Sequence, residues 1–283
     1  MVKIPVKALV RKPILYVNFP GTSRREAIEV ISRDKGCGIA LVRRDTQEFM
    51  GYIPAVKMLA HPEEQQLTLL VEKAYPTLQV TSSIREAAEL MVKHGVWEVP
   101  VVEGSKYVGM VRATDLLRYV VASKVKVEIG EFQSRSYPMA WQGTPITVIG
   151  KLMEFYNEPV VVILGDDGEP IGGVFIQDLL VEGEVETEES SLTLGGMSEG
   201  EDWDWNVSKV VVISKSKFKL PLKLAIDIMK SLPKIYIKTP LTTAAKTLME
   251  KGVQLAFTVD ARGRVEGFIS CMNILKAYVK FST

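Results

Sequence analysis

The sequence predicts an α/β fold in which a unit of strand, helix, strand, strand and helix occurs four times in tandem. Two observations support this prediction: the apolar pattern of an amphipathic helix recurs, and a glycine follows each copy at a nearly constant distance. The glycines Gly51, Gly109, Gly172 and Gly267 lie 24, 22, 23 and 23 residues after Ala27, Ala87, Ile149 and Ala244, respectively. A spacing this regular indicates one structural unit used repeatedly.

The first helix of each repeat is predicted from apolar residues at i, i+3, i+4 and i+7, which share one face of an α-helix. The matching sets are Ile84, Ala87, Ala88 and Met91 in the second repeat, Ile146, Ile149, Gly150 and Met153 in the third, and Leu241, Ala244, Ala245 and Leu248 in the fourth. The first copy, Ala27, Ile28 and Ile31, is the weakest, because Arg24 stands where the other repeats have an apolar residue.

A hairpin and a closing helix are predicted after each first helix. An apolar strand (39–42, 99–102, 159–164 and 255–259) meets a polar turn such as GDDGE or DARGR. Gly and Asp supply the positive φ angles that tight reversals need. A second strand then passes through the repeated glycine, and the apolar first turn of another helix follows within a few residues.

Length and composition are those of a soluble globular protein with a sizeable core. No apolar run approaches the roughly 20 residues that a bilayer requires. The first residues lack the apolar core and cleavage site of a signal peptide. We therefore expect a cytoplasmic protein without membrane insertion. Cys37 and Cys271 have no disulfide or metal-site spacing, so both are expected to be reduced thiols in the core.

The charge is unevenly distributed along the chain. Nine acidic residues and no basic one lie between Glu182 and Asp204, which leaves 35 basic against 25 acidic side chains elsewhere. The segment resembles a solvated linker, although Trp203 and Trp205 are more typical of a docking segment. Lysines 215, 217 and 219 fall on one face of a predicted strand. They are expected to guard an exposed edge, with docking of the acidic segment or RNA binding as alternatives.

Two long segments resemble cystathionine-β-synthase (CBS) domains: TSSIREAAELMVKHGVWEVPVVEGSKYVGMVRATDLL and DIMKSLPKIYIKTPLTTAAKTLMEKGVQLAFTVDARGRVEGFISCMNIL. The first and third repeats resemble the family more loosely. The resemblance implies four CBS repeats packed as two CBS pairs, called Bateman modules. The first pair covers residues 1–122, with repeats at about 1–65 and 70–122. The second covers 123–283, with repeats at about 123–182 and 209–283 and an acidic linker at 182–208.

The resemblance also implies a function. CBS pairs commonly receive adenosine derivatives such as AMP, ADP, ATP or S-adenosylmethionine in clefts between the repeats. Two modules stack into a disk within one chain, as in the gamma subunit of AMP-activated protein kinase, or pair across a homodimer. The implied protein is regulatory and non-catalytic: it binds an adenosine nucleotide, needs no metal, and signals to an effector protein that the sequence does not identify.

The family string Gly, hydrophobic, hydrophobic, Ser/Thr, x, x, Asp closes the second hairpin strand and starts the following helix. Its carboxylate suits the paired hydroxyls of a ribose, while backbone N–H groups at a helix start favour phosphate. In the second repeat the string runs from Gly109 to Asp115 and includes Thr114, with Arg112 in the hydroxyl position. Asp115 is the first-ranked ribose contact, and Arg112 is a candidate phosphate contact.

The other repeats depart further from the string. The third keeps Asp178 but has Phe175 in the hydroxyl position, and the fourth has Ser270 and Asn273. The first has Pro54 and Lys57 and has lost the ribose-binding pattern. Family members commonly contact the base through the extended residues before each first helix, which here are Val80, Thr81, Lys238 and Thr239.

Each of these residues also has a purely structural interpretation. The acids at the closing helices could serve only as helix-start carboxylates, and Thr81 and Thr239 could be simple N-caps. His61 and His94 have no partners at metal-ligand spacing, and there is no phosphate loop, dinucleotide fingerprint or nucleophile elbow. A nucleotide sensor is therefore the preferred hypothesis. The alternatives are an interaction scaffold with degenerate clefts and an RNA- or DNA-binding CBS protein.

Overall fold

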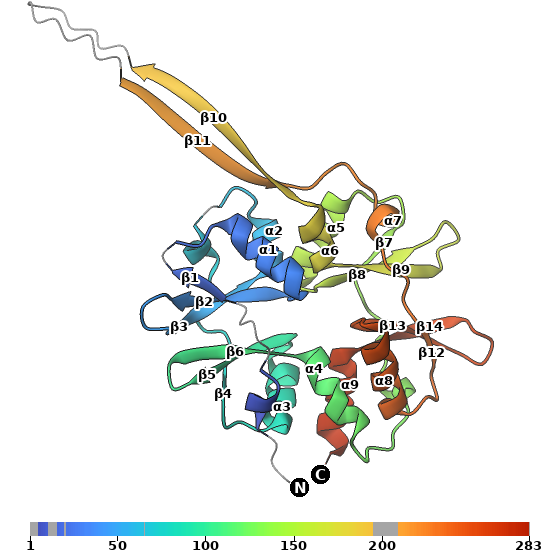
Figure 1. Ribbon diagram of the computed structural model, residues 1–283. Coiled ribbons are helices and arrows are strands. Elements are labelled where there is room, and N and C mark those ends of the chain that lie inside the picture. The colour runs from blue at the N-terminus through green and yellow to red at the C-terminus, as the bar shows by residue number, and fades with distance from the viewer. Residues whose placement is uncertain (1–4, 11–15, 20, 65, 195–208, 283) are drawn as a thin grey trace, which may run out of the picture.

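The computed structural model describes residues 5–10, 16–19, 21–64, 66–194 and 209–282. Figure 1 shows four α/β units packed into one body, from which a long two-stranded ribbon projects. Each unit contains a three-stranded sheet, and the ribbon is a separate two-stranded sheet. The α/β fold of four tandem repeats predicted from the sequence is therefore confirmed.

The repeats have matching elements. Repeat 1 comprises β1 (Tyr16–Phe19), α1 (Arg24–Asp34), β2 (Gly38–Arg43), β3 (Phe49–Pro54) and α2 (Ala55–Ala60). Repeat 2 comprises β4 (Leu78–Gln79), α3 (Ile84–His94), β5 (Glu98–Glu103), β6 (Lys106–Arg112) and α4 (Ala113–Val121). Repeat 3 comprises β7 (Met139–Trp141), α5 (Ile146–Tyr156), β8 (Val160–Leu164), β9 (Pro170–Phe175) and α6 (Ile176–Glu182). Repeat 4 comprises β12 (Lys234–Tyr236), α8 (Leu241–Lys251), β13 (Leu255–Val259), β14 (Val265–Ser270) and α9 (Cys271–Phe281).

The remaining elements lie before or between the repeats. They are the 3-10 helices η1 (Val6–Ala8), η2 (Leu67–Leu70) and η3 (Ile129–Glu131), the short helix α7 (Ala225–Ile228), and the ribbon strands β10 (Glu184–Leu194) and β11 (Lys209–Lys219). Among the described residues, no helix has the length and apolar character needed to cross a bilayer. Cys37 and Cys271 are both free thiols, and burial raises the pKa of Cys271 to about 12.

The repeated glycine permits close contact with a neighbouring chain segment. In repeats 1, 3 and 4, a Cβ atom on this glycine would lie within 3 Å of a backbone carbonyl oxygen of the segment that leads into the other repeat of the pair. These oxygens belong to Glu72 beside Gly51 (2.8 Å), Lys230 beside Gly172 (2.6 Å) and Ser134 beside Gly267 (2.7 Å). The constant glycine therefore reflects a backbone-to-backbone contact that a side chain would prevent.

The sheets pack in pairs. Ala40, Val42 and Tyr52 of repeat 1 form one buried cluster with Tyr107 and Met110 of repeat 2. A second cluster joins Val160, Val162 and Phe175 of repeat 3 to Leu255, Phe257 and Phe268 of repeat 4. Sheet packing thus pairs repeat 1 with 2 and repeat 3 with 4.

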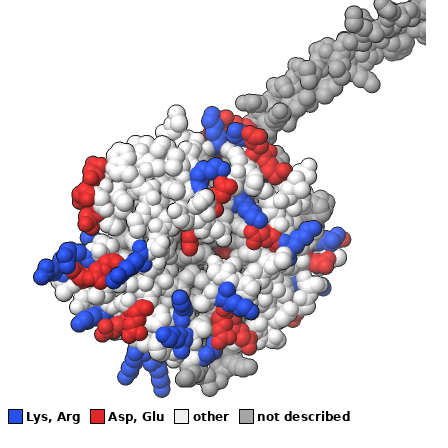
Figure 2. Space-filling model, turned by 180° about the vertical axis from the view of Figure 1, so that it is seen from behind, with Lys and Arg blue, Asp and Glu red and all other residues white. Residues whose placement is uncertain are grey.

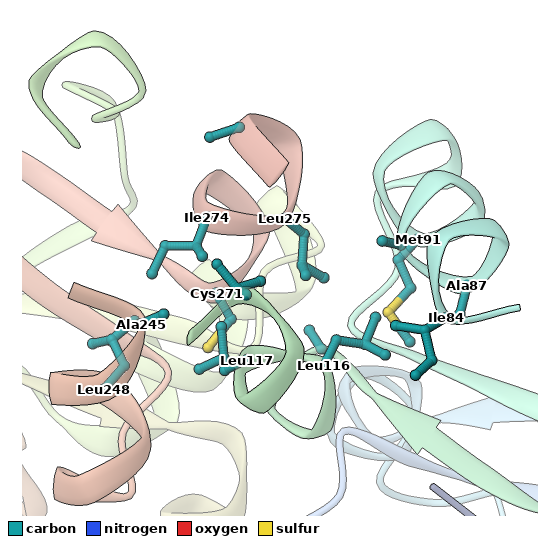
Figure 3. Packing of buried hydrophobic residues seen from close by; sticks show 14 of the residues in the cluster. Ile84, Ala87, Met91, Leu116, Leu117, Ala245, Leu248, Cys271, Ile274 and Leu275 are labelled. Atoms are coloured by element: carbon teal, nitrogen blue, oxygen red, sulfur yellow. The ribbon is translucent and has the colours of Figure 1, made fainter. Parts of the chain in front are cut away.

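The helices pack across these sheet pairs. One large core joins the helices of repeats 2 and 4, and another joins those of repeats 1 and 3. Figure 3 shows Leu116 of α4 facing Ile84 and Met91, with Leu117 near Leu248 and Cys271. These helix cores contain residues from both halves of the chain. The division of the chain into two CBS pairs, 1–122 and 123–283, therefore stays a prediction.

Arg24 explains why the first helical pattern is the weakest. Its side chain is 1% exposed and lies against the end of α2, where Nη1 donates to the carbonyls of His61 (2.6 Å) and Glu64 (2.5 Å). Nη2 donates to the carbonyl of Met58. The guanidinium therefore satisfies carbonyl groups at the helix C-terminus. Burial lowers the pKa of Arg24 to about 10.

Residues 184–194 of the predicted acidic linker are in an extended strand. This segment forms β10, which pairs antiparallel with β11 in the ribbon seen in Figure 1. The register places Glu184, Glu186 and Glu188 opposite Lys219, Lys217 and Lys215. Lys219 Nζ lies 3.2 Å from Glu186 Oε1, because opposite charges on paired strands attract. This contact agrees with the alternative in which the lysines dock the acidic segment. Trp203 and Trp205 lie outside the described residues.

Phe218 anchors the base of the ribbon in the body. It is 4% exposed, belongs to the core of repeats 1 and 3, and donates its backbone N–H to Pro62 at 2.9 Å. Its ring occupies the space beside Gly183, where an added Cβ would lie 1.9 Å from a ring atom. Gly183 is therefore required by the aromatic ring and not by a turn.

We predict that Gly183→Ala displaces Phe218 and lowers the free energy of unfolding by about 1–3 kcal/mol, the usual cost of overpacking. Urea denaturation measures the loss, and limited proteolysis reports loosening of the ribbon. Gly150→Ala is the matched control, because its Cβ would meet neighbouring atoms only at 3.7 Å or more. Equal effects of the two substitutions would contradict this account of the anchor.

Candidate functional site

The closing helices of the repeats begin beside three cavities. The largest, of about 370 Å³, is lined by residues of all four repeats, and we call it the central cavity. Two others have volumes of about 250 Å³ each. The repeat 1 cleft includes Pro54, and the repeat 4 cleft includes Ser270 and Asn273. The start of each closing helix therefore lies at a cavity, and repeats 2 and 3 share the central one.

Asp115 is turned toward its own helix. It is 3% exposed, and its Oδ2 accepts the backbone N–H of Arg112 at 3.1 Å, which caps the start of α4. Asp115 does not line any of the three cavities. The structure thus shows the helix-start role for this residue, and its contact with a ribose stays a prediction.

Arg112 lies at the wall of the central cavity within a buried ion pair. Its Nε is 3.2 Å from Glu98 Oε2, and the two side chains are 8% and 1% exposed. Nη1 donates to the backbone carbonyl of Asp34 in repeat 1. The guanidinium therefore links repeats 1 and 2 at the cavity.

Glu98 connects this ion pair to the repeat 1 cleft. Its Oε1 accepts the hydroxyl of Tyr52 at 2.5 Å and the backbone N–H of Cys37 at 3.1 Å. Glu98, Tyr52 and Cys37 all line the repeat 1 cleft. One carboxylate thus contacts the wall of one cavity and holds the arginine at the wall of another.

The charged pair belongs to repeat 2 alone. Glu98 and Arg112 are cross-strand partners at the junction of β5, β6 and α4. The corresponding pairs are Gly38 with Pro54, Val160 with Phe175, and Leu255 with Ser270. In repeat 2 the acid directly opposite compensates the charge of the buried guanidinium in the hydroxyl position.

The central cavity is surrounded by polar atoms that lack partners. Five buried atoms that make no hydrogen bond to any described residue belong to residues that line this cavity, and one of them, Arg112 Nε, is ion-paired with Glu98. The other four are Ser32 Oγ, Asp34 Oδ2, Arg112 Nη2 and Gln254 Oε1. Unsatisfied buried polar groups are costly, so their concentration here indicates a polar ligand or ordered water in the cavity.

Repeat 3 contributes an acid and an aromatic wall. Asp178 Oδ2 accepts the backbone N–H of Phe175 at 3.1 Å, and its Oδ1 contacts Lys230 Nζ. Phe175 is 5% exposed and lines the central cavity, as do Asp178, Lys230 and Lys35. Thr114, from the first turn of α4, lines the same cavity.

Ser270 and Asn273 cap α9 and also line the repeat 4 cleft. Asn273 Oδ1 accepts the backbone N–H of Ser270 at 3.0 Å and its hydroxyl at 2.7 Å. Ser270 Oγ accepts the N–H of Asn273 at 3.2 Å. The amide therefore replaces the helix-start carboxylate found in repeats 2 and 3.

The candidate base contacts lie away from the three cavities. Val80 donates its N–H to Val102 at 3.0 Å, and the carbonyl of Thr239 accepts from Ile129 at 3.1 Å. Thr81 and Lys238 are exposed. Their contacts with a base stay predictions.

The N-cap interpretation of Thr81 and Thr239 is wrong. Helix α3 begins after Ser83, whose Oγ accepts the N–H of Glu86 at 3.2 Å, and α8 begins after Pro240. Each threonine therefore lies too early in the chain to cap its helix.

Sequence reasoning missed two acids, the buried Glu98 and the half-buried Glu158. Glu98 lines the repeat 1 cleft, and Glu158 lines the repeat 4 cleft. Burial raises the pKa of Glu158. Comparison of the repeats could have found Glu98, because Gly38, Val160 and Leu255 occupy its position in the others.

Comparisons with known proteins agree with this architecture. The model of the CBS domain family matches residues 70–122 and 225–280. A crystal structure of protein MJ1225 from Methanocaldococcus jannaschii has a TM-score of 0.73 at 16% identity and covers 97% of this chain and 100% of that one. An uncharacterised conserved protein from Pyrococcus horikoshii has a TM-score of 0.60 at 19% identity, over 96% and 99% of the two chains.

A curated relative is L-aspartate semialdehyde sulfurtransferase from Methanocaldococcus jannaschii. It is 27% identical over 122 residues, which amount to 42% of this chain. The matched part spans 24% of the relative's length.

We predict that Arg112→Met alone lowers the free energy of unfolding by about 3–5 kcal/mol, because it leaves the buried carboxylate of Glu98 without its partner. Adding Glu98→Gln should recover much of the loss, since the new amide oxygen can still accept from Tyr52 and Cys37. A double-mutant cycle in urea measures this coupling. Lys246→Met with Glu250→Gln, an ion pair whose side chains are 59% exposed, is the control and should show coupling below about 1 kcal/mol. Additive losses at 98 and 112 would contradict the ion pair.

Proposed function

We propose that this protein, a chain of CBS domains, is a non-catalytic regulator that binds an adenosine nucleotide of the AMP, ADP or ATP class in its central cavity. The observation that carries the proposal is the set of four buried polar atoms without partners that belong to residues lining that cavity. The wall also contains the cationic side chains Lys35, Arg112 and Lys230. Such a surface suits a ligand that is both polar and anionic.

The phosphate end of the ligand is assigned to the cationic residues. Arg112 Nη2 has no hydrogen-bond partner among the described residues, while its other nitrogens contact Glu98 and Asp34. The guanidinium is thus oriented before a ligand arrives, which lowers the entropy lost on binding. Arginine also binds phosphate through charge-assisted hydrogen bonds, which are about twice as strong as neutral ones.

The nucleoside end is assigned to the mixed part of the wall. Ser32, Thr114 and Gln254 offer hydroxyl and amide groups to the sugar and to base edges. Phe175 offers an aromatic surface for stacking on the base. The other apolar wall residues are Leu117, Val181, Leu248, Met249 and Val253. The volume of about 370 Å³ lies within the range of small-molecule sites.

The regulatory role rests on the position of the cavity. Every repeat contributes to its wall, so a bound ligand bridges all four. Any difference in affinity between two arrangements of the repeats shifts their populations, and an effector protein can read that shift. The fold similarity to MJ1225, which is described as a proposed archaeal homolog of g-AMPK, supports a sensor.

The other hypotheses have less support. On the face shown in Figure 2, basic and acidic side chains are interspersed. A nucleic-acid interface would be expected to form a continuous basic surface. The charges on that face therefore do not favour the nucleic-acid-binding hypothesis, and we prefer the nucleotide hypothesis.

We predict that isothermal titration calorimetry detects AMP, ADP or ATP binding to the full chain. The combined substitutions Glu98→Gln and Arg112→Met should weaken that binding by about tenfold or more, because a charge-assisted contact to phosphate is lost. The exposed pair Lys246→Met with Glu250→Gln should leave the affinity unchanged. Equal affinity for the wild-type chain and the central-cavity variant, or no binding of any of the three nucleotides, would overturn the proposal.

A further inference from the structure

The outward face of α5 is apolar, although its inward face already supplies the core of repeat 3. Val148, Leu152 and Phe155 follow one another at i, i+4 and i+7, so they share one side of the helix. Phe155 is 82% exposed and Tyr156 is 55% exposed, and their rings pack edge to face with centroids 5.3 Å apart. A helix that is apolar on both sides normally packs against a neighbour on each side.

The other repeats have polar residues on this face. When the core positions of the four first helices are aligned, the positions of Val148 and Phe155 are occupied by Glu26 and Arg33 in repeat 1, Glu86 and Lys93 in repeat 2, and Thr243 and Glu250 in repeat 4. The four helices have the same place in the fold, so the fold does not require apolar residues there. The outward face of α5 therefore serves a contact that the other repeats do not make.

The segment after the ribbon extends this apolar surface. Its backbone lies beside the start of α5: the carbonyl of Lys223 accepts the N–H of Ile146 at 3.0 Å, and Ile226 donates its N–H to Gln142 at 3.0 Å. We define the α5 patch as six exposed residues: Val148, Phe155, Tyr156, Leu222, Leu224 and Ile226. In Figure 2 the upper left of the body, which belongs to repeat 3, is largely free of charged side chains.

The area of the patch matches what a stable interface needs. A fully exposed aromatic side chain presents about 150–250 Å² and an aliphatic one about 60–120 Å², so the exposed fractions of the six residues amount to roughly 350–600 Å². Apolar atoms make up about 60% of an interface, so an interface built on this patch buries about 600–1,000 Å² on each partner. A specific complex typically buries about 800 Å² on each partner.

The face is complementary to itself. When two copies of α5 pack antiparallel about a two-fold axis at Leu152, Val148 lies against the partner's Phe155, because the two are about equally far from the axis. The same arrangement brings Lys151 to the partner's Glu154. Lys151 Nζ lies 2.8 Å from Glu154 Oε2 within one chain, so each face carries both signs of charge. No like charges meet across the axis.

We propose that the α5 patch is a dimer interface, on which a second copy of this chain packs its own α5 antiparallel across a two-fold axis. The apolar area, the opposite charges and the near-symmetry about Leu152 are the features that self-association requires. None of the six patch residues lines the central cavity, the repeat 1 cleft or the repeat 4 cleft. This interface is therefore a site separate from the cavities.

Sedimentation velocity on the full chain, without nucleotide, tests the proposal with two variants of opposite charge. Phe155→Glu places a carboxylate against an apolar residue of the partner, and Val148→Lys places an ammonium group there. Each should weaken dimerisation by about tenfold or more, because the dimer then buries an unpaired charge at two symmetric places. The matched control is Tyr236→Lys, an exposed aromatic residue of repeat 4, which should leave the dimer unchanged.

An equimolar mixture of the two variants should recover the dimer. In the mixed pair, one contact joins the introduced carboxylate to the introduced ammonium group, and the symmetric contact keeps Val148 against Phe155. Circular dichroism confirms that each variant is folded, and a misfolded variant would not show this recovery. The inference is overturned if the wild-type chain sediments as a monomer, if either variant dimerises as tightly as the wild type, or if the mixture stays monomeric.

These outcomes are separate from those of the central-cavity experiment. Calorimetry measures nucleotide binding whether the chain is monomeric or dimeric, and sedimentation measures dimerisation without a nucleotide. Failure of one proposal therefore leaves the other standing.

Discussion

Each repeat of this protein must bury two apolar surfaces at once, one on its helices and one on its sheet. A single neighbour covers only one of them. The sheets of repeats 1 and 2 share a core, as do those of repeats 3 and 4, while the helix cores join repeat 1 to 3 and repeat 2 to 4. Four repeats therefore close into a ring in which both of these surfaces have a partner in every repeat.

This closure creates the central cavity. Helices that meet around a common centre bring their ends together, and helix ends carry polar groups that do not pack well against one another. Ser32, Asp34 and Gln254 lie near the ends of first helices, and Thr114 and Asp178 lie in the first turns of closing helices. The polar wall is thus a consequence of the burial requirement that holds the four units together.

Divergence among the repeats then makes the cavities chemically different. The position that starts the closing helix is Pro54, Arg112, Phe175 or Ser270, while the fold around it is retained. The arginine is tolerated because Glu98 lies directly across the hairpin. An additional acid at 158 changes the repeat 4 cleft in a different way. One scaffold therefore contains neighbouring cavities with different linings.

The sequence by itself determined the repeat count, the helical faces and the hairpins, because these depend on periodicity and turn chemistry within a few residues of one another. It also placed Asp115, Asp178 and Asn273 at helix starts, since the helix-start preference is local. Their capping contacts, such as that of Asp178 with Phe175, follow from the same local order.

Only the tertiary structure decided which residues line a cavity. Asp115 lies next to Thr114 in the chain, yet Thr114 lines the central cavity and Asp115 does not. Glu98 accepts hydrogen bonds from Cys37 and Tyr52, which lie more than 40 residues away in the sequence. The Phe218 ring occupies the space beside Gly183. Contacts between residues so far apart in the sequence depend on how whole repeats pack. The local pattern of apolar residues shows which face of an element is buried, but it does not show which other repeat packs against that face.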